Sequence, residues 1–211
     1  MTTDIGDQLG EAGRSGLRAR KKLATREALS RAALRLALER GLQNVRVDDI
    51  AAEAGVSPRT YNNYFSSREE AICFLSVQRA QRIGAALRAR PPEEPLAEAI
   101  GHAMAEEYAG RSEPDKVTMR MFISEPALRG EYLKGLTAVE GPLAEAIAAR
   151  TGTDPERDLF PRVLAAAVTS AARTATRHYL RTETTAPFAA VVRDAIELIA
   201  PAARAHEGRR A

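Results

Sequence analysis

The sequence predicts an all-α protein of about nine helices, on the evidence of its composition and its apolar periodicity. Apolar residues make up 45% of the chain but aromatic residues only 5%, so aliphatic residues supply most of the apolar mass. Ala and Leu lose little free energy on entering a helix. Apolar residues recur three and four positions apart, and no segment alternates with period 2 for long enough to predict a strand.

Three parts follow one another along the 211 residues. Residues 1–22 are polar and contain four glycines, which predicts a disordered arm that ends in basic residues. Residues 23–68 predict a three-helix domain, and residues 69–211 predict a larger helical domain. The chain is long enough for each domain to have its own core.

The first helix is expected from about Thr25 to Arg40, where the apolar residues share one helical face. Gly41 provides its stop, because glycine accepts the left-handed backbone that ends many helices. Two short helices are then expected over residues 47–54 and 58–65, joined by a tight turn.

Capping residues mark the next helix starts. Ser57 is a preferred N-cap residue and Pro58 suits the first helical position. Ser67 and Glu70 form the spacing of a capping box. Further helices are expected over residues 67–89, 96–108, 115–124, 127–150, 155–180 and 186–205, with Gly141-Pro142 predicted to kink or split the fourth of these.

Basic residues are concentrated near one end of the chain. Residues 13–68 carry twelve Arg and Lys against five Asp and Glu, although the net charge of the whole chain is only +3. This distribution favours a polyanion as partner, with a solvated basic surface as the alternative. Cys73 is the single cysteine, and neither a signal segment nor an 18-residue apolar run is present, so a cytoplasmic protein is expected.

The chemically informative stretch is the pair of short helices at residues 47–65. Its inward face is expected to be apolar, made of Val47, Ile50, Ala51, Val56, Tyr61 and Phe65. The outward face of the second helix has no carboxylate and carries Ser57, Arg59, Thr60, Asn62, Asn63 and Tyr64. Such hydroxyl, amide and guanidinium groups bond phosphates and base edges, and one helix fits the major groove of DNA. The stretch therefore predicts a DNA-binding helix-turn-helix.

The run Asp49-Ile50-Ala51-x-x-Ala54-Gly55-Val56-Ser57-x-x-Thr60-x-x-x-Tyr64-Phe65-x-x-Arg68-Glu69-Glu70 resembles the DNA-binding signature of the TetR family of regulators. The resemblance covers about residues 24–72. It implies a homodimeric, sequence-specific regulator, a repressor that binds a palindromic operator in double-stranded DNA and is released by a small-molecule effector. It also implies that residues from about 75 onward form the effector-binding domain.

Carried over position by position, the resemblance implies that nine residues face DNA: Arg46, Ser57, Pro58, Arg59, Thr60, Asn62, Asn63, Tyr64 and Arg68. Thr60, Tyr64 and Arg68 are expected on phosphates, whereas Arg59 and Asn63 are expected to read bases. Two positions depart from the family pattern. Arg46 stands near where a Thr or Ser often caps the second helix, and Asn62 stands where Tyr is common. The basic arm from Arg14 to Lys22 is expected either to contact the DNA backbone or minor groove, or to be a solubilising tail.

The same resemblance places the dimer interface in the segments 155–180 and 186–205. Each segment carries an apolar stripe, one made of Leu164, Val168, Ala171, Ala172 and Ala175 and one of Val191, Val192, Ala195, Ile196 and Ile199. These stripes fit an interface with a second copy, or else the core of the domain itself.

An effector pocket is expected among apolar side chains with a few hydroxyls, namely Met119, Phe122, Ile123, Tyr132, Leu136, Leu143 and Tyr179. Packing in the core is the alternative for each of them. Arg120 is expected to bind an acidic group of the effector or to pair with Glu125 or Glu131. Residues 119–128 resemble regulators related to the mycofactocin regulator, which implies a lipophilic or acyl-CoA-like effector and no cofactor or metal.

The sequence is less consistent with three other classes of protein. An enzyme is disfavoured because His102, His178 and His206 lack metal-site spacing and the chain has no phosphate loop or nucleophile elbow. A redox sensor would act through Cys73, which reads as a buried thiol between apolar neighbours. A nucleoid-type protein would bind DNA without an operator, and the Arg and Asn residues of the outward face favour a preferred site instead.

Overall fold

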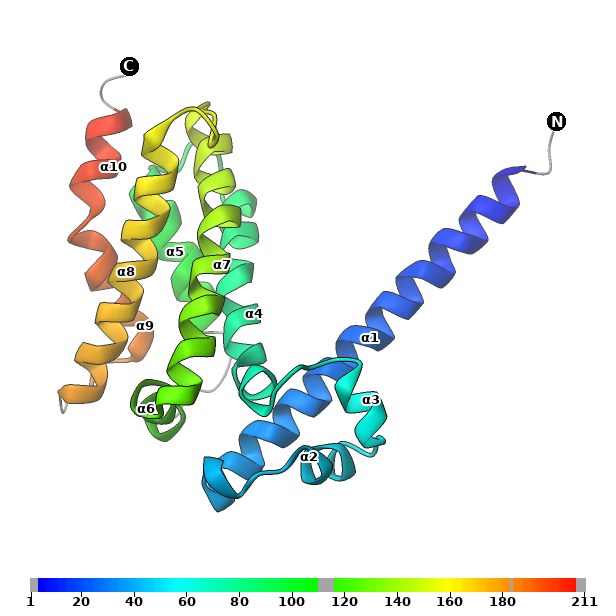
Figure 1. Cartoon of the computed structure of the whole chain (residues 1–211). Coiled ribbons are helices and arrows are strands. Elements are labelled where there is room, and N and C mark those ends of the chain that lie inside the picture. The colour runs from blue at the N-terminus through cyan, green and yellow to red at the C-terminus, as the bar shows by residue number, and fades with distance from the viewer. Residues whose placement is uncertain (1–3, 110–115, 183, 208–211) are drawn as a thin grey trace. The chain divides into compact units, whose positions relative to one another are not determined.

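The computed structural model describes residues 4–109, 116–182 and 184–207, and side chains over residues 16–107, 116–182 and 184–205. Over these ranges the chain is all-α, as predicted from the sequence (Figure 1). The elements are α1 (Asp4–Arg40), a 3₁₀ turn η1 (Leu42–Asn44), α2 (Val47–Glu53), α3 (Pro58–Asn62), α4 (Arg68–Ala89), α5 (Leu96–Ala109), α6 (Lys116–Ser124), α7 (Pro126–Thr151), α8 (Leu159–Arg181), α9 (Phe188–Glu197) and α10 (Ala200–Glu207).

Two compact units divide the chain inside α4, one covering Met1–Leu75 and the other Ser76–Ala211. In the first unit, α1 packs against η1 and α2, and α2 packs against α3. Its core is the buried face of α1 together with the apolar side chains of the two short helices, as the periodicity predicts: Leu29, Ala33, Leu36, Ile50, Ala51, Tyr61 and Phe65 are all buried.

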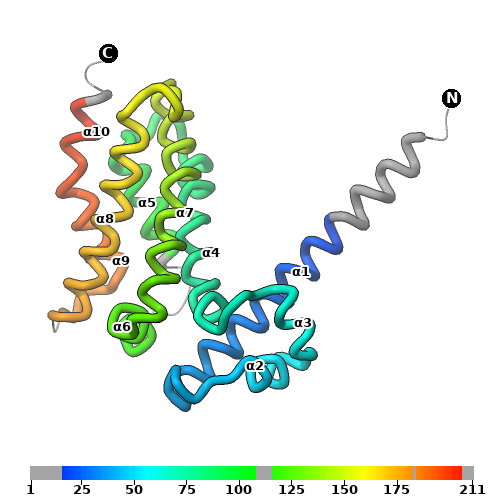
Figure 2. The backbone as a smooth tube through the Cα atoms, viewed as in Figure 1, coloured from blue at the N-terminus to red at the C-terminus, as the bar shows by residue number. Residues whose placement is uncertain are grey.

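The second unit is a helical bundle in which α7 packs on α8, α8 on α9, and α9 on α5, while α6 lies against α7 and α8. Figure 2 shows the backbones of α7 and α8 running side by side. The core joins residues from all of these helices, with Leu87, Ile100, Leu143 and Val192 among its most buried members. In the ranges described above, no helix combines the length and the hydropathy needed to span a lipid bilayer.

The first helix is longer than predicted. α1 begins at Asp4 and continues to Arg40, so the prediction of a disordered arm before Thr25 is wrong for residues 4–22, while residues 1–3 lie outside the described chain. Glycines lower helix propensity by about 1 kcal/mol each, but the segment contains no proline to end a helix. The end of α1 follows the prediction, because Gly41 takes φ 78° and donates its N–H to the Ala37 carbonyl (3.0 Å).

The last predicted helix is two helices. α9 ends at Glu197 and α10 begins at Ala200, so the single helix predicted over 186–205 is wrong. Pro201 gives the physical reason, since it has no N–H to donate to the carbonyl of Glu197 and its ring would collide with that group.

A kink or split was predicted at Gly141-Pro142. α7 instead continues from Pro126 to Thr151 with Pro142 inside it, so no split occurs. Packing explains this, since Gly84 of α4 lies against the Pro142 carbonyl and Arg88 donates to the same oxygen (3.4 Å). Tertiary contacts therefore hold the helix where local propensity disfavours it.

The two stripes proposed for a dimer interface belong to the core of the second unit. Leu164, Val168 and Ala175 of α8 are buried there, as are Val192 and Ile196 of α9. The remaining stripe residues, Ala171, Ala172, Val191, Ala195 and Ile199, pack partly buried against the same core. The helical period identified the apolar faces, and within one chain their residues are buried or partly buried against this core.

Candidate nucleic-acid interface and effector pocket

The turn between α2 and α3 is built by backbone geometry and one capping side chain. Gly55 takes φ 69°, a left-handed conformation that glycine adopts without a steric penalty. The Val56 N–H donates to the Ala51 carbonyl (2.9 Å), which closes the turn. Ser57 is the N-cap of α3, as predicted, and its Oγ accepts the Thr60 N–H (3.1 Å). This hydrogen bond stabilises the N-terminus of α3.

The outward face of α3 carries the residues predicted to face DNA. Of these, Thr60 and Tyr64 are half-buried, and the following are exposed: Ser57, Pro58, Arg59, Asn62 and Asn63. The sequence places no Asp or Glu between residues 54 and 68. α3 itself is short, because it ends at Asn62 rather than at Phe65 as predicted. The face offers donors without a negative charge to repel phosphate.

Two buried aromatic residues, Tyr61 and Phe65, pack on the inner side of this helix-turn-helix. Tyr61 is only 1% exposed, and its hydroxyl donates to the Ser67 carbonyl (2.8 Å) at the start of α4. Its ring lies 5.8 Å from that of Phe65, centroid to centroid. Burial raises the pKa of the Tyr61 hydroxyl far above its ordinary range, and the nearby Glu70 and Glu69 add to the rise. Tyr61 therefore remains a neutral hydrogen-bond donor.

Arg26 is a supporting residue that the sequence interpretation missed. Its guanidinium lies over the rings of Phe74 (4.3 Å to the centroid) and Phe65 (5.0 Å), and it pairs with Glu70 (3.4 Å). It therefore ties α1 to the start of α4 and to the residues behind α3. A signal was present, because Arg26 continues the buried helical face of Leu29 and Ala33 by one more step.

Arg68 makes two bonds within the protein. Its Nη1 donates to the Val45 carbonyl (2.9 Å), and its Nε donates to Glu69 (2.7 Å). The side chain thus braces the loop before α2 with two of its donors, and only its remaining N–H groups are available to a phosphate.

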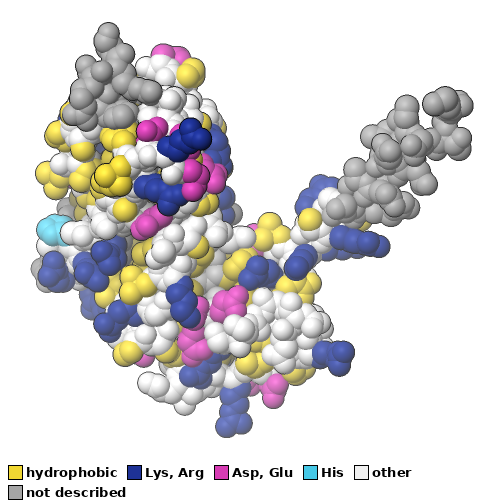
Figure 3. Space-filling model, turned by 45° about the horizontal axis from the view of Figure 1, so that its top comes forward, with side chains coloured by type: hydrophobic (Ala, Val, Ile, Leu, Met, Phe, Trp, Pro, Cys, Tyr) yellow, Lys and Arg dark blue, Asp and Glu magenta, His cyan; other side chains and the backbone are white. Residues whose placement is uncertain are grey.

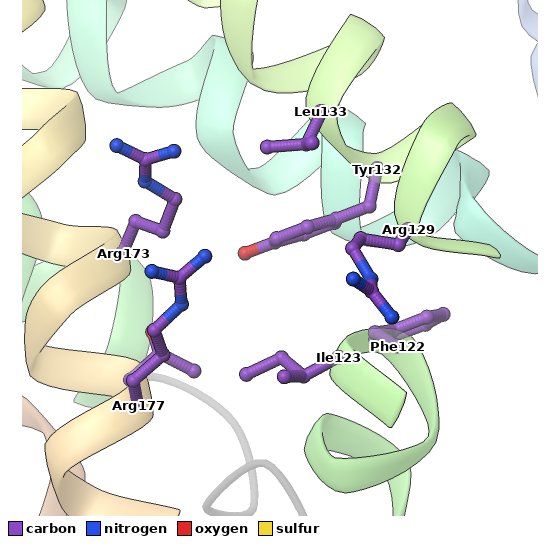
Figure 4. A pocket seen from close by; sticks show the side chains of 8 residues that line it. Phe122, Ile123, Arg129, Tyr132, Leu133, Arg173 and Arg177 are labelled. Carbon is purple, nitrogen blue, oxygen red and sulfur yellow. The ribbon is translucent and has the colours of Figure 1, made fainter. Parts of the chain in front are cut away.

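A pocket lies in the second unit among α6, α7 and α8 (Figure 4). Its volume is about 140 Å³, and its lining is Phe122, Ile123, Arg129, Tyr132, Leu133, Arg173, Thr176 and Arg177. Three of the predicted pocket residues, Phe122, Ile123 and Tyr132, line it. The three arginines were not anticipated, because only the packing of α7 on α8 brings Arg129 to the neighbouring pair Arg173 and Arg177.

The other predicted pocket residues lie elsewhere. Met119, Leu143 and Tyr179 belong to the core, and Leu136 lines a neighbouring hollow with Glu140 and Thr169. Arg120 donates to the Leu180 carbonyl (3.4 Å), so the predicted pairing with Glu125 or Glu131 is not formed.

Comparison with known proteins identifies the family. Residues 29–71 match the family described as bacterial regulatory proteins, tetR family, and residues 91–204, more than half of the chain, match the MftR C-terminal domain. The chain is 34% identical to the HTH-type transcriptional regulator TcmR of Streptomyces glaucescens over 180 residues, which covers 80% of this chain and 79% of that relative. The chain belongs to the TetR family.

Solved TetR-type structures share the fold. The fatty acid degradation regulator FadR of Bacillus halodurans has a TM-score of 0.54 at 18% identity, over 83% of this chain and 94% of that chain. FadR of Thermus thermophilus, a repressor solved with lauroyl-CoA, has a TM-score of 0.54 at 21% identity, over 82% and 92% of the two chains. At these identities the likeness speaks for the fold alone. As a member of the TetR family, the chain is a transcriptional regulator of the DNA-binding kind.

One departure from the TetR pattern has a visible structural effect. Arg46 is the N-cap of α2, and no side-chain bond caps the helix from that position, because a guanidinium has no acceptor. Asp49 supplies the reciprocal half of the cap, since its carboxylate accepts the Arg46 N–H (3.2 Å). The Arg46 side chain is exposed and remains available to a ligand.

Proposed function

We propose that this TetR-family regulator is a repressor that binds a palindromic operator as a homodimer and releases it when a small molecule occupies the second unit. The single observation that carries the DNA-binding half is the outward face of α3, where exposed Arg59, Asn62 and Asn63 stand without a neighbouring carboxylate. Arg pairs with guanine and Asn with adenine through two hydrogen bonds, which gives such a face sequence preference. Thr60 and Tyr64 would contact phosphates at its edge.

Selection of genomic fragments bound by the full-length protein tests the operator. We expect a pseudo-palindromic motif with half-sites spaced by about one helical turn, about 34–36 Å, or more. If no motif is enriched over bulk DNA, the proposal is contradicted and sequence-independent binding is favoured. The affinity of such binding depends strongly on salt concentration and little on sequence.

Arg59→Ala is the matching variant. We expect it to weaken operator binding by about 1–3 kcal/mol, or about five- to 150-fold in Kd, and to relax the preference at one base pair. Arg31→Ala is the control, because Arg31 is exposed on α1 and pairs only with Glu27 (3.4 Å) in the described chain. Equal operator binding by the two variants, measured by fluorescence anisotropy, would remove Arg59 from the interface.

The homodimer is supported by apolar side chains that one chain leaves exposed. On α8, Leu159 is 76% exposed and Val163 is 53% exposed, and at the turn between α9 and α10 Leu198 is 83% exposed. These positions lie in the segments proposed for the interface, although they differ from the stripes first assigned to it. Large apolar side chains that are exposed in one chain favour burial against a second copy.

Charge placed in this surface should separate the protomers. We expect Val163→Asp to shift the protein from dimer to monomer in sedimentation velocity, because an unpaired carboxylate would be buried in the interface. Val117→Asp is the control, because Val117 is 62% exposed but lies on α6. A Val163→Asp protein that sediments as the parent does would place the interface elsewhere.

The effector half of the proposal rests on the family and on the pocket among α6, α7 and α8. The Thermus thermophilus relative was solved with lauroyl-CoA, and a lipophilic or acyl-CoA-like effector is proposed here by analogy. By thermodynamic linkage, an effector that lowers the affinity for DNA must bind more weakly to the DNA complex than to the free protein, by the same factor.

A further inference from the structure

The pocket among α6, α7 and α8 is strongly cationic. Arg129 of α7 and Arg173 and Arg177 of α8 line it, and no carboxylate is part of its lining. Figure 4 shows the guanidinium group of Arg177 reaching from α8 towards the hydroxyl of Tyr132, whereas the guanidinium group of Arg173, on the same helix, turns away from this hydroxyl. Because Arg173 and Arg177 are four residues apart on one helix, they share a face and repel one another when nothing negative lies between them.

None of these three arginine side chains has an ion-pair or hydrogen-bond partner within the described part of the chain, in contrast to several other arginines of the bundle. Arg82, Arg90 and Arg162 each pair with a glutamate of the same unit at 2.6–2.9 Å. The carboxylate of Glu140 lies in the neighbouring hollow, where it accepts the Thr169 hydroxyl (3.1 Å) and makes no ion pair with Arg173. Within the described residues, no carboxylate compensates the positive charge of the pocket.

The walls of the same pocket are apolar. Phe122 and Tyr132 stack with their rings nearly parallel (3°, centroids 5.8 Å apart), and Ile123 and Leu133 complete the lining. The volume of about 140 Å³ is close to that of a cavity that holds one benzene ring. It is smaller than most pockets that enclose a whole drug-sized ligand. Such a space fits one ring or a short chain that carries an anionic group.

We propose that this pocket binds the anionic head group of an amphipathic acid, with Arg173 and Arg177 donating hydrogen bonds to the carboxylate or phosphate. The apolar part of the ligand lies against Ile123, Leu133 and the stacked rings. Arginine donates two parallel hydrogen bonds to such groups, and charge-assisted bonds of this kind are about twice as strong as neutral ones. The inference deepens the proposed function, because it gives the chemical class of the effector, and it rests on that function only for the link to DNA.

Calorimetric titration of the full-length protein without DNA tests the head group directly. The probes are benzoate, phenyl phosphate and the neutral benzyl alcohol, which share one benzene ring. We expect at least one of the two anions to bind about tenfold or more tightly than the alcohol. The benzoate and phosphate arms tell a carboxylate ligand from a phosphate ligand.

Arg173→Gln/Arg177→Gln should bring the anion to within about twofold of the alcohol, since the amides keep much of the length but lose the charge. Arg181→Gln, an exposed arginine of α8 outside the pocket, is the control and should keep the preference. Three outcomes would overturn the proposal: no anion binds, the alcohol binds as well as the anions, or the double variant keeps the preference. A double variant that keeps the preference but loses self-association would assign the arginines to a second copy instead. Anion binding by a protein that selects no operator would refute the proposed function and leave the pocket assignment standing.

Discussion

Tyr61 and Tyr64 lie three residues apart and have different surroundings. Tyr61 is buried and gives its hydroxyl hydrogen to the Ser67 carbonyl, whereas Tyr64 is half-buried at the edge of the outward face. The first side chain supports the domain, and the second is proposed to contact a phosphate. Removal of one oxygen atom from each therefore distinguishes a residue that maintains the fold from one that binds DNA.

We expect Tyr61→Phe to lower the free energy of unfolding by about 0.5–1.5 kcal/mol, because the variant loses its hydrogen bond to the Ser67 carbonyl, which then accepts only the Ala71 N–H (3.3 Å). Tyr64→Phe should leave the free energy of unfolding unchanged and weaken binding to all DNA sequences alike. Urea denaturation and fluorescence anisotropy on the same two proteins measure the two effects. Equal stability of the Tyr61→Phe variant and the parent would show that the hydroxyl has no structural role.

At this scale the sequence predicts orientation well and pairing poorly. The helical period placed Tyr61 inward and Arg59 outward, because one angle per residue decides the side of a short helix. The partners of Arg26 and Arg68 were not predictable in the same way. Arg68 bonds the carbonyl of Val45, and a backbone acceptor has no signature in the residue type.

Among the elements, two helix glycines have contrasting surroundings. A Cβ atom added to Gly84 of α4 would lie 2.9 Å from the Pro142 carbonyl oxygen of α7, which is backbone and cannot rotate away. A Cβ atom added to Gly101 of α5 would meet only the Cγ of Arg193, at 4.0 Å. The first glycine allows two helices to approach closely, and the second has room for a methyl group.

Gly84→Ala should therefore destabilise the protein by about 1–3 kcal/mol through overpacking. Gly101→Ala should stabilise it by about 0.5–1 kcal/mol, since alanine restricts the unfolded chain and suits a helix interior. The two variants serve as controls for each other in thermal unfolding followed by circular dichroism. A stabilised Gly84→Ala protein would mean that α4 and α7 are not held in this close contact.

Helix boundaries were predictable at several breaker residues, although the break before Pro201 was missed, and were uncertain where packing decides. Gly41 and Pro58 mark an end and a start as expected, and Ser57 caps α3 as expected. Pro142 misled the prediction, because the contact with α4 holds α7 continuous. The start of α1 was missed for the reverse reason, since glycines without a proline weaken a helix but do not stop it.

In the second unit, one charged cluster connects the end of α4, the middle of α5 and the end of α7. Arg90, after α4, donates through Nε and Nη2 to both carboxylate oxygens of Glu94 (2.8 Å each). His102 of α5 lies 2.6 Å from the same carboxylate, Nδ1 to Oε1. Arg150 of α7 donates to the backbone carbonyls of Arg90 (3.0 Å) and Glu94 (2.7 Å). The Pro-rich connection between α4 and α5 is fixed by these bonds.

The hydrogen bonds from Arg90, with a further contribution from His102, lower the pKa of Glu94 from 4.5 to about 2. A carboxyl whose pKa is lower in the folded state stabilises the protein fully above its unfolded pKa, and this contribution is lost as the pH falls towards the folded value. We therefore expect the stability difference between the parent and Glu94→Gln to be largest near neutral pH and to shrink between about pH 4.5 and pH 2.

Chemical denaturation at a series of pH values checks this expectation, with Glu93→Gln as control because Glu93 is exposed beside the cluster. A difference between the parent and Glu94→Gln that stays constant down to pH 2 would contradict the lowered pKa of Glu94.

At the scale of the whole chain, the all-α class and the family could be predicted from the sequence. The whole cluster around Glu94 and the whole set of pocket arginines could not, because each also needs a side chain from a distant helix, Arg150 in the first case and Arg129 in the second.

The unbroken course of α1 has a consequence for the arm that precedes the helix-turn-helix. Arg18, Arg20, Lys21 and Lys22 are exposed on a preformed helix, and Figure 3 shows Lys and Arg side chains along its described part, while the Arg14 side chain lies outside the described residues. A helix with its side chains is about 10–12 Å across, whereas the minor groove of B-DNA is about 6 Å wide. An arm of this width is excluded from the minor groove by its own diameter. We therefore expect its basic side chains to contact phosphates, which would add affinity without adding sequence information.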